Sequence, residues 1–300
     1  MIHGVRTSNG RESLGLFYGL LGVIAFSLTL PSSRAAVGAF GSILTGPGRA
    51  LIAAVFAAAA LWWRHERRPH KKHVPGLIMV AVGAIFGFPF LSAWAMSRLP
   101  ASHGAVELAL LPLATAAVST IRNRERPSIL FWLCSCAAAG TVIVYAWFTG
   151  LGGLHMADLA LIGAVIIVAF AYAEGGRLAG ELGGWQVIAW AILISVPLIV
   201  TCVIVDLTLT GVNGLMHASW QAWVSLLYLG IGSQFFGFVA WYTGMGMGGV
   251  ARVSQMQYLQ PFLTVLFSWM LLGEKLTLST IAAAFLVIFW VAIGKRTSIQ

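Results

Sequence analysis

Charged side chains are the scarcest feature of this 300-residue sequence. Asp, Glu, Lys and Arg together make up 9% of the chain, with 9 acidic residues against 18 basic ones. A water-exposed surface needs about a quarter of its residues charged. The chain is instead 59% hydrophobic, with a mean hydropathy of +0.89. This composition excludes a soluble enzyme and predicts an all-α integral membrane protein, because a bilayer-spanning segment must satisfy its own backbone hydrogen bonds.

Cysteine is also rare, and recognisable catalytic or nucleotide-binding motifs are missing. Cys134, Cys136 and Cys202 all fall in apolar runs and lack the spacing of metal ligands. The sequence has no phosphate-binding loop and no Ser/His/Asp constellation. We therefore expect no metal and no cofactor, and an energy source other than ATP hydrolysis by this chain. The net charge of +9 lies in short basic clusters between apolar runs, which indicates membrane topology rather than nucleic-acid binding.

Apolar runs bordered by charged, Gly or Pro residues predict ten membrane-spanning helices. The runs are about twice as long as barrel strands and lack the alternation of such strands. The expected helices cover residues 14–33, 43–63, 74–97, 101–121, 129–149, 157–180, 184–208, 221–244, 250–272 and 277–294.

The distribution of Lys and Arg predicts which side of the membrane each connection faces. Short connections that carry positive charge stay in the cytoplasm. With the N-terminus inside, thirteen basic residues fall on the cytoplasmic side, and only Arg34, Arg98 and Lys275 fall on the outer side. Both termini are therefore expected in the cytoplasm. Two termini on the same side require an even number of spans, and ten meets this requirement.

The second half of the sequence repeats features of the first. A shift of 149 residues places Pro112 on Pro261 and Glu125 on Glu274. Because each half holds five expected helices, an odd number, the second half must enter the membrane in the opposite orientation. The expected organisation is a cytoplasmic tail (1–13), two inverted five-helix repeats (14–150 and 151–294) and a second cytoplasmic tail (295–300).

Segments 105–126 and 253–275 each carry a mid-helix Pro that is followed 13 residues later by Glu and a basic residue. The second copy ends in Gly273-Glu274-Lys275-Leu276-Thr277, whereas the first copy, around Glu125, lacks the Gly. This pattern of ten helices in two halves resembles the drug/metabolite transporter superfamily, and in particular its EamA-type members. The resemblance implies a central cavity between the halves and an exporter of amino acids or other metabolites in a bacterial inner (plasma) membrane.

Ionisable residues inside a membrane are costly and mark candidate sites. Glu107 lies about 9 Å along the fourth expected helix from its start, at the standard helical rise. His103 precedes it by four residues, so the two side chains share a helix face. This pair is a candidate site for a substrate ammonium group or a coupling proton. The alternative is a structural pair with the second helix, which carries Arg49.

Four further charged residues are candidates for binding or gating. Arg49 follows Gly46-Pro47-Gly48, which is expected to distort the start of the second helix. The Arg49 guanidinium either binds a substrate carboxylate or extends to the outer lipid headgroups. Arg252 is a gate candidate or extends to headgroups in the same way. Glu174 and Arg177, three residues apart, suit a gate or an interfacial ion pair.

Aromatic and polar residues within the helices predict the character of the cavity. Trp94 and Trp241 occupy matching positions in the two halves, at a shift of 147 residues. Ser254, Gln255 and Tyr258 give the ninth helix polar groups, which line a cavity or form hydrogen bonds between helices. An aromatic, amphipathic lining favours zwitterionic or cationic organic molecules with an apolar side chain.

The sequence therefore favours a secondary transporter that exports amino acids, including aromatic and apolar ones, or similar small amphipathic metabolites by alternating access. One alternative is a proton antiporter for drugs or organic cations. Another is an integral-membrane enzyme in which His103 and Glu107 act as acid and base on a lipid-soluble substrate. The expected partners are a small-molecule solute and the lipid bilayer, with the protein acting as a monomer or a homodimer.

Overall fold

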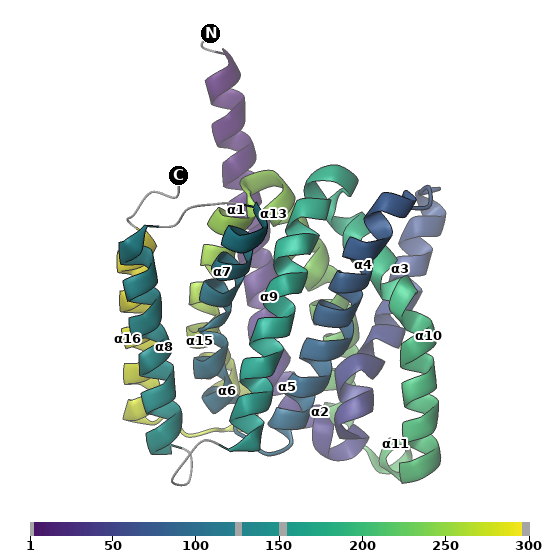
Figure 1. Cartoon of the computed structure of the whole chain (residues 1–300). Helices are drawn as coiled ribbons and strands as arrows, with labels where there is room; N and C mark the ends of the chain where they lie inside the picture. Colours follow the sequence, from purple (N-terminus) through teal and green to yellow (C-terminus); the bar gives the residue numbers. More distant parts are fainter. Residues whose placement is uncertain (1–2, 124–127, 150–154, 296–300) are drawn as a thin grey trace.

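The computed structural model describes residues 3–123, 128–149 and 155–295. Within these residues every regular element is a helix and none is a strand. The helices pack side by side in one bundle, and α1 (His3–Ser27) begins at the same end of the bundle at which α16 (Leu278–Lys295) finishes (Figure 1). The all-α architecture expected from the composition is confirmed.

Six helical stretches in the described part of the chain are long and apolar enough to cross a membrane. Stretches of that length and hydropathy match the thickness of the hydrocarbon core. The protein is therefore a multi-pass membrane protein. The six stretches are Gly10–Trp63, Lys71–Met96, Ala101–Thr120, Met156–Leu182, Gly184–Thr210 and Trp220–Gly248.

The first stretch differs from the expected pattern because helix fills the segment between its two expected spans. Its elements after α1 are α2 (Thr29–Ile43), η1 (Leu44–Gly48) and α3 (Arg49–Trp63). The expected spans end at residue 33 and begin again at residue 43, whereas α2 continues as helix across that gap, so these two boundaries are wrong. Pro31 falls in the first turn of α2, where its missing N–H costs no helical hydrogen bond. Helical geometry fails instead at Gly41 (φ 69°) and at Gly46 (ψ −107°), so the distortion expected beside Pro47 is confirmed.

Two other stretches contain a wide π-helical turn between two α-helical parts. The elements of the first are η2 (Lys71–His73), α4 (Val74–Val80), η3 (Ala81–Gly87) and α5 (Phe88–Met96). The elements of the second are α12 (Trp220–Tyr228), η4 (Leu229–Gly237) and α13 (Phe238–Gly248). Such turns interrupt the regular hydrogen-bond ladder and are frequent at functional sites.

The proline of each end motif marks the start of a helix. Pro112 is the second residue of α7 (Leu111–Asn123), and Pro261 is the second residue of α15 (Gln260–Leu272). Proline suits the first turn of a helix and disrupts the interior. Each span is therefore divided where the motif places its proline. The remaining elements are α6 (Ala101–Leu108), α8 (Ile129–Thr149), α9 (Met156–Leu182), α10 (Gly184–Thr210), α11 (Asn213–His217), α14 (Val250–Ser254) and η5 (Gln255–Leu259).

Close packing holds α1 against α13 in the core of the bundle. A Cβ atom added to Gly15 would lie 2.6 Å from the backbone nitrogen of Gly248, so only glycine fits there. About two turns further along the pair, Val23 of α1 and Trp241 of α13 are fully buried. Because lipid is as apolar as the helix surfaces, packing of this kind is what stabilises helix pairs in membranes.

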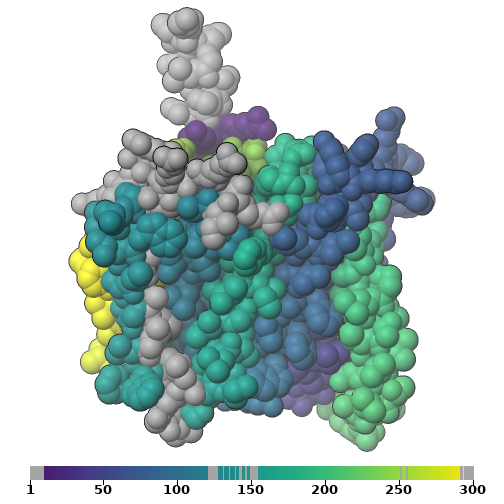
Figure 2. Space-filling model, viewed as in Figure 1, coloured from purple at the N-terminus to yellow at the C-terminus, as the bar shows by residue number. Residues whose placement is uncertain are grey.

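Large apolar side chains cover the outside of the bundle, as lipid contact requires. Val55 of α3, Phe148 of α8 and Leu209 of α10 are all exposed. Figure 2 shows α9, α4 and α10 side by side along one face of the molecule. A surface of this kind is stable in hydrocarbon and would aggregate in water.

Candidate functional site

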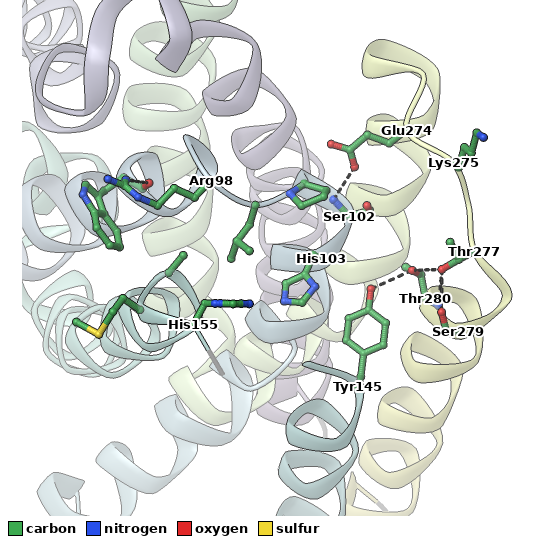
Figure 3. Close-up of a pocket in the computed structure, with 15 residues that line it drawn as sticks. Arg98, Ser102, His103, Tyr145, His155, Glu274, Lys275, Thr277, Ser279 and Thr280 are labelled. Carbon is green, nitrogen blue, oxygen red and sulfur yellow. Dashed lines mark hydrogen bonds between the residues drawn. The ribbon is translucent and has the colours of Figure 1, made fainter. Parts of the chain in front are cut away.

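A cavity of about 960 Å³ opens at the end of the bundle opposite to the start of α1. It lies between the end of α5, the starts of α6 and α9, and the connection from α15 to α16 (Figure 3). A cavity of this size is in the range of small-molecule sites. We call this cavity the vestibule. Its lining includes Trp94, Arg98, His103, Tyr145, Glu274 and Thr280.

Glu274 fixes the start of α6 at the edge of the vestibule. Gly273 ends α15 in the left-handed conformation (φ 65°) that glycine adopts easily. The carboxylate of Glu274 then accepts hydrogen bonds from the backbone N–H groups of Ala101 and Ser102, each at 2.9 Å. Figure 3 shows the bond to Ser102. These N–H groups have no partner inside α6, and the start of a helix favours negative charge. The Gly-Glu pair of the end motif therefore links α15 to α6.

Aromatic side chains lie on two sides of the vestibule. The guanidinium carbon of Arg98 is 3.8 Å from the centre of the Trp94 ring, which is a cation–π contact. On the other side, the hydroxyl group of Tyr145 lies 2.9 Å from Oγ1 of Thr280 (Figure 3). Trp94, a candidate from the sequence, thus lines the cavity with its side chain half-buried.

Three buried ionisable side chains meet at the inner wall of the vestibule. His103 lines the vestibule, and its Nε2 atom lies 3.3 Å from Oε1 of Glu107 and 3.0 Å from Oδ1 of Asp158. Four-residue spacing on α6 brings His103 and Glu107 together, as expected. Asp158 reaches the pair from the first turn of α9. We call these residues the His103 cluster.

The two carboxylates of the His103 cluster differ in their hydrogen bonding. Glu107 is 1% exposed, and neither carboxylate oxygen has a hydrogen-bond donor within the described residues. Oδ2 of Asp158 accepts a hydrogen bond from the backbone N–H of His155 at 2.6 Å, in a capping box at the start of α9. A buried carboxylate whose oxygens lack hydrogen-bond donors is costly, and the contact with His103 at 3.3 Å is the one ion pair of Glu107 in the described structure.

Arg49 lies deep in the bundle, without a carboxylate beside it. The residue is 1% exposed. Its Nε donates a hydrogen bond to Oε1 of Gln234 at 3.0 Å, and its Nη1 has no hydrogen-bond partner. No described carboxylate forms an ion pair with Arg49, so the expected alternative of a pair with Glu107 is wrong. Extension to the lipid headgroups is wrong as well, because the guanidinium is enclosed by protein.

Aromatic rings surround a small closed pocket beside Arg49. The pocket has a volume of about 10 Å³, which leaves room for about one water molecule. The ring centre of Phe26 lies 4.8 Å from that of Phe238, and the ring centre of Tyr172 lies 5.6 Å from that of Trp241. The indole N–H of Trp241 has no hydrogen-bond acceptor in the described structure. The pocket also contains the side chains of Thr29, Ser233 and Gln260.

Charged side chains form ion pairs at the opposite end of the bundle, near the start of α1. Nη2 of Arg177 lies 2.7 Å from Oε1 of Glu174, and Nη1 lies 2.6 Å from Oε1 of Glu181. Glu181 also contacts Nε2 of His73 at 3.1 Å. Glu174 and Arg177 therefore form an ion pair, which Glu181 extends from α9 to the start of α4.

Comparison with protein families identifies the chain. The model of the EamA-like transporter family matches residues 13–147 and, a second time, residues 155–293. The chain belongs to the EamA-like transporter family. The resemblance seen in the end motif is therefore confirmed, and the protein is a membrane transporter of the drug/metabolite transporter superfamily.

This EamA-like transporter has relatives in two bacteria and a counterpart among solved structures. It is 36% identical over 287 residues to the uncharacterized transporter YdeK of Bacillus subtilis (strain 168), with 94% of this chain and 97% of the relative covered. It is 23% identical over 260 residues to a probable terminal-alkyne amino-acid exporter of Streptantibioticus cattleyicolor, with 85% and 84% covered. A crystal structure of another protein has the same fold, with a TM-score of 0.68 and 20% identity over 94% of this chain and 96% of that one.

The remaining candidate residues of this EamA-like transporter lie near the junction of α13, α14 and η5. Arg252 forms an ion pair with Glu12 of α1 rather than extending to headgroups. Ser254 is buried and Tyr258 is half-buried. The side chain of Gln255 lies outside the described residues. The described side chains among them, those of Arg252, Ser254 and Tyr258, do not line the vestibule or the pocket beside Arg49.

Three residues of the two candidate sites in this EamA-like transporter were missed from the sequence. Asp158 is an acidic residue at the edge of an expected span, where a carboxylate commonly caps a helix, so its position alone does not indicate a site. Gln234 is an amide within an apolar stretch, and the cost of such a group in lipid was the signal that could have identified it. Tyr172 resembles many other membrane-protein tyrosines, and no sequence signal separates it from them.

Proposed function

We propose that this transporter is a secondary exporter of amino acids and similar small amphipathic carboxylates, which it moves by alternating access. The observation that carries the proposal is Arg49, a buried guanidinium that has no carboxylate partner among the described residues and has aromatic rings around it. An uncompensated charge in the membrane interior is costly and is retained where it has a function. A solute carboxylate supplies the missing partner.

The chemistry around Arg49 matches an amino acid better than it matches a sugar or an organic cation. Nε of Arg49 is occupied by Gln234, which leaves the two Nη groups to bind a carboxylate in bidentate fashion. Phe26, Tyr172 and Phe238 offer apolar rings for a side chain. A cationic solute without a carboxylate would be repelled by the guanidinium, which disfavours the organic-cation antiporter.

A relative supports the same class of substrate. The Streptantibioticus protein is named as a probable exporter of a terminal-alkyne amino acid, which is a zwitterion with an apolar side chain. Such a molecule needs a cation for its carboxylate and an apolar surface for its hydrocarbon chain. Arg49 and the surrounding rings supply these two features.

Alternating access follows if the protein has ten spans in two inverted five-helix repeats. The family model matches the chain twice, and the π turns η3 and η4 fall at corresponding places in the two matches. The packing is also reciprocal: α1 packs on α13 as α9 packs on α5, while α3 pairs with α10 and α8 with α16. Two halves of this kind can exchange conformations around a shared site.

The structure represents one state of that cycle. The vestibule is open at one end, whereas the ion pairs of Arg177 and of Arg252 close the other end. The pocket beside Arg49 holds no more than a water molecule, so it must widen to admit an amino acid. The basic connection 64–73 lies at the closed end (Figure 1), and we assign that end to the cytoplasm of a bacterial inner membrane.

Transport by purified protein in liposomes tests the proposal. Apolar and aromatic amino acids should exchange across the membrane, and the amines that lack the carboxylate should not. The recovered solute should be chemically unchanged. Conversion of the solute would indicate the membrane enzyme, movement of amines in preference to amino acids would indicate the organic-cation antiporter, and either result would overturn the proposal.

A further inference from the structure

The His103 cluster differs chemically from the Arg49 site, because it gathers negative charge and nitrogen rather than a cation. It contains two carboxylates, from Glu107 and Asp158, and one imidazole. All three side chains are buried, and their ligand atoms lie within 4.8 Å of one another. We propose that His103, Glu107 and Asp158 bind a divalent transition-metal ion, with Zn²⁺ as the best match.

The distances within the cluster suit a tetrahedral ion. Zn²⁺ binds nitrogen and oxygen ligands at about 2.0 to 2.2 Å, which places two ligand atoms of a tetrahedron about 3.3 to 3.5 Å apart. Nε2 of His103 lies 3.3 Å from Oε1 of Glu107 and 3.0 Å from Oδ1 of Asp158. All ligand atoms lie within 4.8 Å of one another, so inward movements of the side chains would complete the geometry.

The hydrogen bonding of the cluster also favours a cation. A single ring nitrogen of His103 faces both carboxylates, and one N–H cannot satisfy both of them. The two oxygens of Glu107 have no hydrogen-bond donor in the described structure. A divalent ion would balance the two carboxylate charges and coordinate all three residues. Zn²⁺ fits this mixed set better than Mg²⁺ or Ca²⁺, which prefer six or more oxygen ligands.

The surroundings of the cluster support metal binding in two further ways. The backbone N–H of His155 holds Oδ2 of Asp158 at 2.6 Å, which orients Oδ1 toward His103. Partners of this kind orient the ligands in known metal sites. His103 also lines the vestibule, so an ion can enter from there. With three protein ligands, a fourth position stays available for water or for a group of the solute.

Metal binding is measured directly on the purified full-length protein, without solute, after treatment with a chelator. Titration with Zn²⁺ in a calorimeter and elemental analysis of the loaded protein should both give one ion per chain. Titration with Co²⁺ should produce the visible absorption of a tetrahedral nitrogen and oxygen site. Wild-type protein that binds no stoichiometric Zn²⁺ overturns the proposal, whatever the variants do.

Variants locate the ion. Glu107→Gln and Asp158→Asn keep the shape of each side chain and should each weaken Zn²⁺ binding by about 100-fold or more, since loss of even an outer partner costs 10- to 100-fold. The control is His217→Gln, which removes an exposed histidine of α11 and should leave the affinity unchanged. Equal loss in the control and in the cluster variants would place the ion on surface histidines and refute the site.

A failure of this proposal can be told apart from a failure of the proposed function. Zn²⁺ affinity is measured without any transport assay, and amino-acid exchange is measured separately with chelated and with Zn²⁺-loaded protein. Circular dichroism of each variant shows whether its helices are intact. Amino-acid exchange without Zn²⁺ binding would leave the exporter in place and remove the metal site.

Discussion

Replacement of Arg49 by methionine separates a substrate-binding role from a structural one. Methionine keeps an unbranched chain of similar reach and removes the charge. In a structural ion pair, such a change leaves a buried carboxylate without its partner and costs about 3 to 5 kcal/mol. Arg49 forms no such pair with a described carboxylate, so the folded protein should tolerate its loss. Binding of a solute carboxylate, in contrast, should be lost with the Arg49 charge.

The expected magnitudes follow from the contacts of Arg49. Each charge-assisted hydrogen bond to a solute carboxylate contributes about 1.5 to 3 kcal/mol, so two bonds at the lower figure give about 3 kcal/mol. This corresponds to about a 100-fold loss of affinity. The fold loses one 3.0 Å hydrogen bond to Gln234, which costs about 1 kcal/mol, plus the cost of the Gln234 oxygen left unpaired. It also loses a desolvated charge, which offsets that cost by several kcal/mol.

The assay compares an amino acid with the amine of the same side chain. Wild-type protein should prefer the amino acid by about 100-fold in exchange across liposomes. Arg49→Met should lose that preference while its thermal stability stays close to wild type. Arg64→Met, an exposed substitution at the other end of the same α3 region, is the matched control and should change neither property. A stability loss of about 3 kcal/mol or more with the preference intact would refute the reasoning and make Arg49 structural.

Three further predictions follow from contacts in the fold and the vestibule. Glu274→Gln should lower the stability by about 2 kcal/mol in thermal unfolding, because the charge that caps α6 is lost. Glu12→Gln, which removes one partner of an exposed ion pair, should cost less than about 1 kcal/mol. Equal costs for the two variants would contradict the capping role of Glu274. Gly15→Ala should lower the stability of the protein by about 1 to 3 kcal/mol, because the added Cβ meets the backbone of α13. In Gly38→Ala the added Cβ meets no neighbouring atom, so this variant should be slightly more stable than wild type. A Gly15→Ala variant that is more stable than Gly38→Ala would rule out the close contact. Trp94→Ala should weaken binding of aromatic solutes by about 2- to 10-fold and of alanine much less, and an equal loss for both would show that Trp94 only packs.

The long apolar runs were sufficient to predict the helices, because a membrane allows few other structures. The end motif predicted the family for a related reason, since Gly273 and Glu274 form a turn and a helix cap that depend on local residue types. The segment 34–42 escaped prediction. Its glycines and its single arginine resemble a connection, and the hydrogen bond from Arg34 to the Met96 carbonyl oxygen, at 2.6 Å, arises only in the folded bundle.

Candidate residues were harder to interpret because their roles depend on neighbours that are distant in the chain. His103 and Glu107 lie one helical turn apart, so their contact was predictable. Asp158 completes the cluster from 51 residues beyond Glu107, and nothing in its local sequence reveals that meeting. Arg49 left two interpretations open, since the depth of its side chain depends on how η1 displaces the start of α3.

Trp94 and Trp241 occupy matching positions in the two family matches but have different environments in the fold. In the fold, Trp94 lines the open vestibule, whereas Trp241 is fully buried among the rings near Arg49. If the halves are inverted, these matching positions lie toward opposite faces of the membrane. In a state that is open at only one end, one of the two positions then lies near the opening and the other near the closed end. Their environments must therefore differ although their sequence positions match. The same reasoning explains why the His103 cluster lies beside a cavity at one end of the bundle while ion pairs form around Arg177 at the other end: both arrangements belong to a single state that is open at one end.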